Sequence, residues 1–157
     1  GLQGIRPEEC DSVVIAGMGG EKITAILAAA PWTAEGRHTL LLQPMTRAEE
    51  LRKFLAEHRY AIRRERFVFD RGTIYPVIET GAGKMCLSPG ELWGGTAPLR
   101  DPLRDRYLVE RIIRLTGAIA GLSRSRREED LEKADALREV VTALLSMREE
   151  GRRANGS

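Results

Sequence analysis

The chain has 157 residues, of which 42% are hydrophobic and 31% are charged, and its formal net charge is +2. This length allows one hydrophobic core with a small extension, and the composition is too apolar for a disordered chain. No apolar run is long enough to span a membrane, and a charge so close to neutral permits nucleic-acid binding without indicating it.

Cysteine and histidine patterns predict no metal site. Cys10 and Cys86 lie far apart and match no metal or redox spacing, so we interpret them as reduced thiols of a cytoplasmic protein. Neither His38 nor His58 belongs to a carboxylate or cysteine pattern that would make it a ligand. We therefore expect no metal cofactor.

The first predicted element is a strand that breaks into glycines. A β-branched run over residues 12–16 is followed by Gly-Met-Gly-Gly at residues 17–20, and apolar residues at helical spacing then continue to Pro31. Ligands of open α/β sheets bind outside the carboxyl ends of strands, where glycines allow close approach to the main chain. The turn is therefore a candidate site, although glycines after a strand are also typical of a purely structural turn.

A second unit repeats this order. An apolar strand over residues 39–42 ends at Gln43-Pro44, and Thr46 with Glu49 predicts a capping box for a following helix. Two successive strand–helix units indicate a parallel sheet.

The next sequence pattern is that of a β-hairpin. Strand-like runs at residues 64–69 and 73–80 are separated by Asp-Arg-Gly at residues 70–72, a hairpin turn signal. Tyr75 is interpreted as a core residue, with stacking on a nucleic-acid base as the alternative. Glycine and proline over residues 81–98 predict an ordered connector without a helix.

Two long helices are predicted in the last third of the chain. Heptad seams over residues 108–122 and 134–144 indicate two helices that pair. Residues 100–127 carry a net charge of +5 and residues 128–150 a net charge of −5, so an antiparallel hairpin would be electrostatically matched.

Two glycines interrupt the first of these helices. A glycine costs about 1 kcal/mol in a helix interior relative to alanine. Gly117 and Gly121 therefore predict a close contact with another helix, or a kink.

The order of the elements resembles the second half of a class I methyltransferase with an appended coiled coil. The motifs are similar in order and spacing to the bacterial tRNA adenine-22 N1-methyltransferase family, namely Val-Ile-Ala-Gly-Met-Gly-Gly at residues 14–20, Leu-Leu-Gln-Pro at residues 41–44, the hairpin with Tyr75, and Leu-Ser-Pro-Gly at residues 87–90. The resemblance extends from Gly1 to about residue 150. In that family an asparagine usually follows Gln-Pro, whereas Met45 follows here.

The resemblance implies an α/β fold, the C-terminal half of a Rossmann-like methyltransferase sheet followed by a helical coiled-coil hairpin. We expect a partial methyltransferase domain at residues 1–84, a connector at 85–99, the helical hairpin at 100–150 and a disordered tail at 151–157.

The family begins with a strand and a glycine-rich loop that binds the methionine part of S-adenosylmethionine, followed by an acidic residue for the ribose. Neither precedes Gly1, and Gly1-Leu2 looks like the tail of the family's Asp-Gly-Leu element beside the adenine ring. By this resemblance the chain is a fragment that lacks most of the cofactor site. We expect it to be inactive alone, with its first strand as an exposed sheet edge.

The function implied is S-adenosylmethionine-dependent methylation of adenine N1 at position 22 of tRNA. The lone pair of N1 is available at neutral pH, so the reaction needs alignment more than a base, and no catalytic residue is predicted. By resemblance, the residues expected beside the cofactor are Gly17, Met18 and Gly19. Those expected at the target base are Gly20, Gln43 and Pro44, and those expected at tRNA phosphates are Lys22, Arg47, Arg104, Arg111 and Arg114.

A different class of function stays open. In a non-enzymatic protein- or RNA-binding module, the glycine turn would be structural and the helical hairpin would dock the partner. A dinucleotide-binding enzyme is poorly supported, because residues 17–20 lack the full Gly-x-Gly-x-x-Gly spacing.

Overall fold

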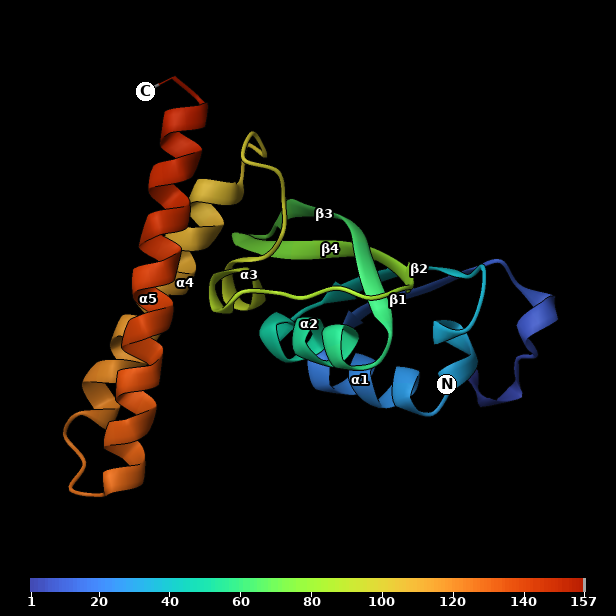
Figure 1. Cartoon of the computed structure of the whole chain (residues 1–157), viewed down its shortest axis with the longest axis horizontal. Helices are drawn as coiled ribbons and strands as arrows, with labels where there is room; N and C mark the ends of the chain where they lie inside the picture. The colour runs from blue at the N-terminus through green and yellow to red at the C-terminus, as the bar shows by residue number, and fades with distance from the viewer. Residues whose placement is uncertain (157) are drawn as a thin grey trace.

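The computed structural model describes residues 1–156 and contains a four-stranded sheet in the order β1-β2-β4-β3 (Figure 1). The strands are β1 (Ser12–Met18), β2 (Thr39–Pro44), β3 (Tyr60–Asp70) and β4 (Thr73–Ala82). β1 and β2 are parallel, and β4 is antiparallel to both β2 and β3. Two parallel strands are thus followed by a reversed hairpin, as the sequence predicts.

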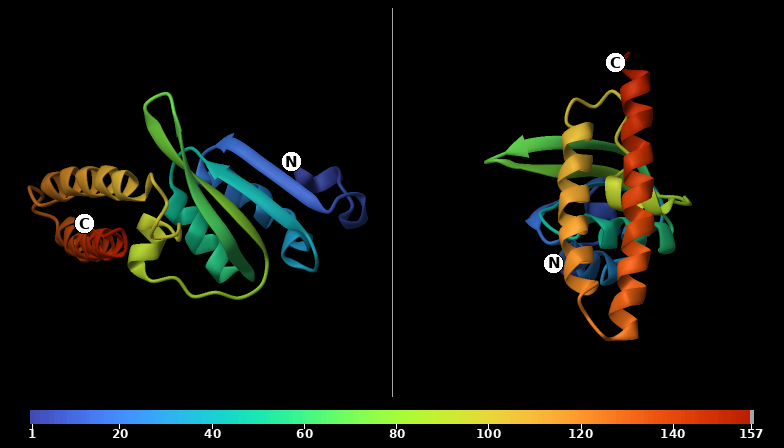
Figure 2. Two further views of the ribbon diagram at one scale, coloured as in Figure 1. Left: turned by 90° about the horizontal axis from the view of Figure 1, so that it is seen from above. Right: turned by 90° about the vertical axis from the view of Figure 1, so that its left-hand side faces the viewer.

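The directions of the strands bring three carboxyl ends to one edge of the sheet. Because β4 is antiparallel to both β2 and β3, β3 runs in the same direction as β1 and β2. The carboxyl ends of these three strands therefore lie at the same edge, and the β3–β4 hairpin projects beyond the ends of β1 and β2 (Figure 2). Its two turn residues, Arg71 and Gly72, have φ values of 46° and 86°, as the tight turn favoured in hairpins requires.

Two helices cover one face of the sheet, α1 (Gly20–Ala28) and α2 (Ala48–Glu57) (Figure 1). Side chains alternate along β1, so that Val13 and Ile15 are buried beneath these helices, whereas Val14 between them is 66% exposed. Leu41 of β2, the partner of Val14, is also exposed. The main core therefore fills only one face of the sheet, and the other face carries apolar side chains in contact with solvent. Short 3-10 helices occupy Leu2–Gly4, Pro7–Glu9 and Pro31–Ala34.

The predicted connector without a helix is wrong for one segment, because α3 (Pro89–Gly94) lies within it. Ser88 caps this helix: its hydroxyl accepts a hydrogen bond from the Glu91 amide at 3.2 Å, while the Glu91 carboxylate accepts one from the Ser88 amide at 2.8 Å. This capping box and proline at the first helical position start a helix despite the glycine content of the segment.

The long helices α4 (Arg104–Leu122) and α5 (Glu128–Ala154) lie side by side as an antiparallel hairpin (Figure 2). Leu108 and Leu115 of α4 are buried with Val140 and Leu144 of α5. α5 continues through Ala154, four residues into the segment predicted to be disordered, and residue 157 lies outside the described residues. Among residues 1–156, no helix combines the length and the apolar character needed to cross a membrane.

The helical hairpin has a cross-helix ion pair and two exposed glycines. The two helices are joined by an ion pair between Asp105 of α4 and Arg148 of α5 at 2.7 Å, which has the opposite polarity to the net charges of the two segments. Gly117 and Gly121 are exposed, and nothing lies within 4 Å of the position that a Cβ would occupy at either residue. The predicted close helix contact at these glycines is therefore wrong, since they face away from α5.

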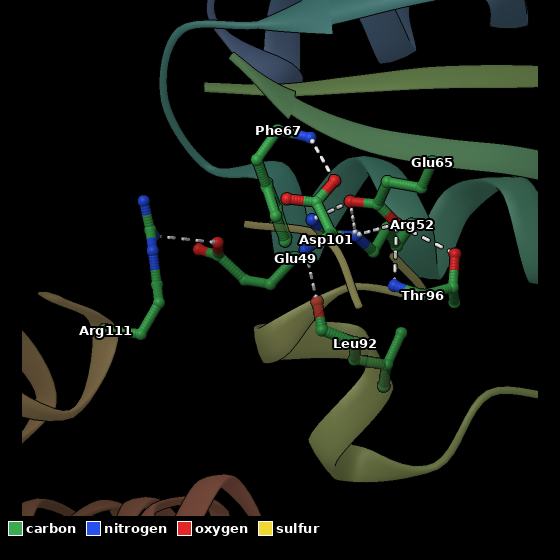
Figure 3. Close-up of polar contacts among 8 residues, drawn as sticks. All are labelled: Glu49, Arg52, Glu65, Phe67, Leu92, Thr96, Asp101 and Arg111. Atoms are coloured by element: carbon green, nitrogen blue, oxygen red, sulfur yellow. Dashed lines mark hydrogen bonds and ion pairs between the residues drawn. The ribbon is translucent and has the colours of Figure 1, made fainter. Parts of the chain in front are cut away.

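A buried polar network joins the sheet to the helical part of the chain (Figure 3). Arg52 of α2 and Glu65 of β3 form an ion pair with 0% exposure of either side chain. Arg52 also donates a hydrogen bond to the carbonyl oxygen of Leu92 in α3 at 2.8 Å, and Glu65 accepts hydrogen bonds from the amide and hydroxyl of Thr96. One pair of side chains thus connects α2, β3, α3 and the segment that leads into α4.

Candidate active site

The glycine turn lies at the carboxyl ends of the two parallel strands. Gly17 has a φ of 72°, in the left-handed region that favours glycine, and its amide donates a hydrogen bond to Oε1 of Gln43 at 2.9 Å. The amide of Met45 donates one to the carbonyl oxygen of Met18 at 2.8 Å. The ends of β1 and β2 are therefore held together by one side-chain and one backbone hydrogen bond.

The glycines of this turn have different surroundings. Nothing lies within 4 Å of the position of a Cβ on Gly17, so the backbone there is open to a ligand. At Gly19 a Cβ would lie 2.9 Å from the hydroxyl of Thr46, and at Gly20 it would collide with the carbonyl oxygen of Arg47. Gly20 is buried, and its amide donates a hydrogen bond to the carbonyl oxygen of Thr46. Gly19 and Gly20 thus allow close packing of α1 on the next loop, and Gly17 is the glycine left accessible.

The expected capping box at Thr46 and Glu49 is not formed, and this prediction is wrong. The residue that precedes α2 is Arg47, with a φ of 51° and no side-chain cap. The Arg47 guanidinium instead forms ion pairs with Glu21 in the first turn of α1 and with Glu50 in the first turn of α2. Arg47 therefore holds the two helix starts together, which leaves it poorly suited to a tRNA phosphate.

Gln43 and Pro44 differ in their access to this edge. Oε1 of Gln43 is occupied by the Gly17 amide, while its Nε2 donates to the thioether sulfur of Met45 at 3.3 Å. A thioether is a weak acceptor, so this amide group can exchange it for a better one on a bound ligand. Pro44 is buried and ends β2. Of the two residues, Gln43 is therefore the one whose side chain is available to a ligand.

Lys22 lies near the start of the chain. It is exposed and lines a crevice of about 210 Å³ with residues 1–3 and the outer side of α1. This crevice lies beside the Gly1-Leu2 element, which the resemblance places near the cofactor's adenine ring.

The predicted arginines of α4 have different environments. Arg111 is only 12% exposed, and its Nη1 lies 4.0 Å from the Glu49 carboxylate (Figure 3). Its guanidinium lies over the Tyr107 ring. Arg104 is buried, donates to the carbonyl oxygen of Met147, and has its pKa lowered by that burial. Arg114 is exposed, and no carboxylate within residues 1–156 forms an ion pair with it. Arg114 is thus the arginine of this set that is best placed to contact a ligand.

Tyr75 lies on the bare face of the sheet. It is half-buried, pairs with Val68 across the hairpin and belongs to none of the hydrophobic clusters found among residues 1–156. The interpretation of Tyr75 as a core residue is therefore wrong. The sequence signal that could have indicated this is the strand alternation, which puts Tyr75 on the face opposite to Ile74 and Pro76, both of which are buried.

The sheet order and the open glycine turn at the carboxyl end of a parallel strand define a Rossmann-like fold with a candidate ligand site at its usual edge. Residues 1–78 match the family described as a methyltransferase domain. The resemblance seen in the sequence is confirmed. The chain is 39% identical over 83 residues to the tRNA (adenine(22)-N(1))-methyltransferase of Bacillus subtilis (strain 168), an alignment that covers 53% of this chain and 35% of the relative.

Solved structures confirm the fold over nearly the whole chain. The B. subtilis m1A22 tRNA methyltransferase superposes with a TM-score of 0.78 at 26% identity, covering 94% of this chain and 67% of that protein. A Streptococcus pneumoniae protein described as a putative tRNA (m1A22) methyltransferase has a TM-score of 0.77 at 24% identity, covering 94% of this chain and 66% of that one. The chain thus spans about two thirds of the length of these structures.

Proposed function

We propose that this chain carries the base-side part of an S-adenosylmethionine-dependent methyltransferase that acts on N1 of adenine 22 in tRNA. The observation that supports this most directly is the open turn at Gly17, tied to Gln43 by a hydrogen bond, in a chain similar to the B. subtilis tRNA (adenine(22)-N(1))-methyltransferase. The glycine turn at residues 17–20 and the Gln-Pro segment at residues 43–44 meet at the edge where Rossmann-like sheets bind ligands.

The cofactor proposed is S-adenosylmethionine. A similar S. pneumoniae structure is in complex with S-adenosyl-L-methionine, and an M. capricolum structure with a TM-score of 0.59 is in complex with S-adenosyl-homocysteine. The open Cβ position and left-handed backbone of Gly17 fit a ligand lying against the main chain. Gly17 and Met18 would lie along its methionine part. When bound, this cofactor supplies a methyl group activated on a sulfonium sulfur.

The residues of this chain orient the target base. Adenine N1 is unprotonated at neutral pH, so the reaction depends on alignment rather than on proton removal. Gln43 has one half of its amide fixed by the Gly17 backbone and the other half only weakly held by Met45. It is therefore preorganised to donate a hydrogen bond to a ring nitrogen of a base drawn out of its stack.

The tRNA would be bound by exposed basic side chains near this edge and along α4. Arg114 is exposed and without an ion pair among residues 1–156, and Lys22 lines the crevice beside α1. Arg47 and Arg111 are engaged with carboxylates of the chain and are assigned a structural part. Exposed arginine and lysine contacts of this kind position a nucleic acid through its phosphates.

The test is methyl transfer from labelled S-adenosylmethionine to bulk bacterial tRNA, with the modified nucleoside identified by mass. It uses the protein from the reading frame extended upstream of Gly1, and the 157-residue chain alongside. We expect N1-methyladenosine from the extended protein and none from the chain alone. A folded extended protein that binds tRNA without methylating it would instead indicate a non-enzymatic binding module.

A matched pair of variants ties the activity to the turn. Gly17 and Gly36 are both exposed, both have positive φ and both have open surroundings, so alanine introduces comparable backbone strain at each. Gly36 precedes β2, at the opposite edge of the sheet. Gly17→Ala should reduce methyl transfer while Gly36→Ala leaves it close to the wild-type rate. Equal rates for the two variants would remove the turn from the proposed site.

A further inference from the structure

The β3–β4 hairpin has one face that points away from α1 and α2. Cross-strand pairing places Val68 beside Tyr75, while Phe67 and Ile74 on the opposite side are buried. Val68 is 43% exposed although it is apolar. We refer to this surface as the hairpin face. Its residues are Arg64, Arg66, Val68, Asp70, Thr73, Tyr75, Val77 and Glu79, of which Arg64 and Glu79 form an ion pair at 3.9 Å.

The hairpin face lies at the edge of the sheet that carries the candidate active site. β3 runs parallel to β1, so the tip of the hairpin and Gly17 are on the same side of the molecule. The tip extends past the ends of β1 and β2 (Figure 2). A polynucleotide with one base at Gly17 would therefore have its neighbouring nucleotides near the hairpin.

The charge of the hairpin suits a polyanion. Residues 63–71 contain four arginines and two acidic residues, of which Glu65 is buried and paired with Arg52 while Asp70 is exposed beside the turn. Arg66 and Arg71 are exposed, and no carboxylate of residues 1–156 lies within ion-pair distance of either. The exposed side chains of this segment therefore carry more positive than negative charge, and two of the arginines are without an ion pair among the described residues.

The hairpin tip is also supported from its other side. The guanidinium of Arg106 in α4 lies over the ring of Phe69, 4.6 Å from its centre, and is held by an ion pair with Glu110. The tip therefore rests against α4. A supported tip presents Tyr75 with less conformational entropy to lose when a ligand binds.

We propose that the hairpin face binds the single-stranded nucleotides that flank the target adenine, with Tyr75 stacking on a base and Arg66 and Arg71 contacting phosphates. Aromatic side chains stack on bases of any sequence, and arginines beside them track the backbone, which is the usual composition of a single-strand binding surface. The identification of the RNA as the methylated tRNA rests on the proposed function. The surface itself is defined by strand register, exposure and charge.

The test measures binding of an unmodified tRNA transcript to the 157-residue chain by fluorescence anisotropy between 50 and 200 mM salt. Tyr75→Thr keeps a strand-forming residue without a ring, and Arg71→Asn gives Asn-Gly, the favoured pair for this turn. Arg66→Thr removes the second charge. Lys53→Gln is the control, because Lys53 is also an exposed cation but lies on α2, which covers the other face of the sheet.

Stacking on one base corresponds to roughly ten-fold in affinity, so Tyr75→Thr should weaken binding by about that factor with an unchanged salt dependence, and Tyr75→Phe should restore it. Arg66→Thr with Arg71→Asn should reduce the slope of log K against log salt by about 1.4, since each single-strand phosphate contact contributes about 0.7. If Tyr75→Thr does not fold, Tyr75→Leu replaces it, because leucine keeps the apolar contact with Val68 without a flat ring.

Affinities of the Tyr75 and arginine variants equal to that of Lys53→Gln would overturn the proposal, as would the absence of tRNA binding by the wild-type chain. These results are separate from the methyl-transfer assay. Weakened RNA binding without methylation by the extended protein would support the hairpin face and reject the enzyme. Methylation by the extended protein, with unchanged RNA binding by the hairpin variants, would support the enzyme and reject the hairpin face.

Discussion

Arg52 and Glu65 form an ion pair in which neither side chain has any exposure to solvent. Burial on its own lowers the pKa of the Arg52 guanidinium, but the Glu65 carboxylate beside it outweighs this and raises the pKa above its usual value. Further hydrogen bonds to Leu92 and from Thr96 satisfy groups that the pair itself leaves open. The pair therefore stays charged within the protein interior.

Breaking this pair should destabilise the chain strongly. Glu65→Leu leaves the Arg52 charge buried without a partner, and such a change costs about 3–5 kcal/mol. The double variant Arg52→Met, Glu65→Leu should recover part of the loss, since no charge is then buried. Urea unfolding measures both, with Glu57→Gln as the control, because Glu57 is exposed in its pair with Lys53 and should change stability by less than about 0.5 kcal/mol. A Glu65→Leu variant as stable as Glu57→Gln would contradict a stabilising role for the buried ion pair.

Glycine to alanine substitutions should have opposite effects in α1 and α4. Gly117→Ala and Gly121→Ala fill open positions in an exposed helix and should each raise stability by about 0.5–1 kcal/mol. Gly20→Ala forces a methyl group against the carbonyl oxygen of Arg47 and should lower stability by about 1–3 kcal/mol. Thermal unfolding of the three variants shows directly whether each substitution raises or lowers the stability. Destabilisation by Gly117→Ala would show that α4 has a close neighbour at this position.

Alkaline pH should destabilise the chain through Tyr60. Burial raises the pKa of the Tyr60 hydroxyl, an effect that its hydrogen bond with Thr33 partly offsets. The stability it contributes is fully present below the unfolded-state pKa of about 10 and is lost as pH rises through the folded value, because only the unfolded chain ionises readily in this window. Tyr60→Phe should lose about 1 kcal/mol at neutral pH and show a weaker decline above pH 10. If the free energy of unfolding declined equally in the wild type and in Tyr60→Phe between pH 9 and 11, groups other than Tyr60 would cause the decline.

The hydrogen bond between Gln43 and Gly17 should be visible in amide exchange. Gln43→Ala removes the acceptor and should increase the exchange rate of the Gly17 amide about ten-fold, while Gln43→Glu keeps an acceptor and should preserve protection. The measurement is hydrogen exchange by NMR, with the Met45 amide, which bonds to the Met18 carbonyl, as the internal reference. Unchanged protection of Gly17 in Gln43→Ala would mean that another group satisfies this amide.

The sheet and its glycine turn could be predicted because their signals are local. β-branched residues before Gly17 and the Asp-Arg-Gly turn each specify a conformation within a few residues. The same reading failed at Thr46, because α2 begins one residue later, after Arg47 in the left-handed conformation, while the carbonyl oxygen of Thr46 accepts a hydrogen bond from the Gly20 amide, 26 positions earlier. A capping pattern cannot reveal such a distant contact.

The junction of the sheet and the helical hairpin could not be predicted for a similar reason. Arg52 is followed by Lys53 in an amphipathic helix and is read as a surface charge, yet its partners lie 13 and 40 residues away. Glu65 lies among arginines in a strand that looks exposed on both faces. Only the folded chain brings these groups together, and the burial of each depends on the other.

The buried network around Arg52 also fixes the distance between two parts of the molecule. It fixes α3 and the segment leading into α4 to the sheet, so the long axis of the helical hairpin keeps a set angle and span from the turn at Gly17. An RNA held along α4 and at the turn would be selected by the length between its two contact points, independently of its sequence. A change in the number of residues between β4 and α4 would then alter which RNA shapes fit, while both contact surfaces stayed intact.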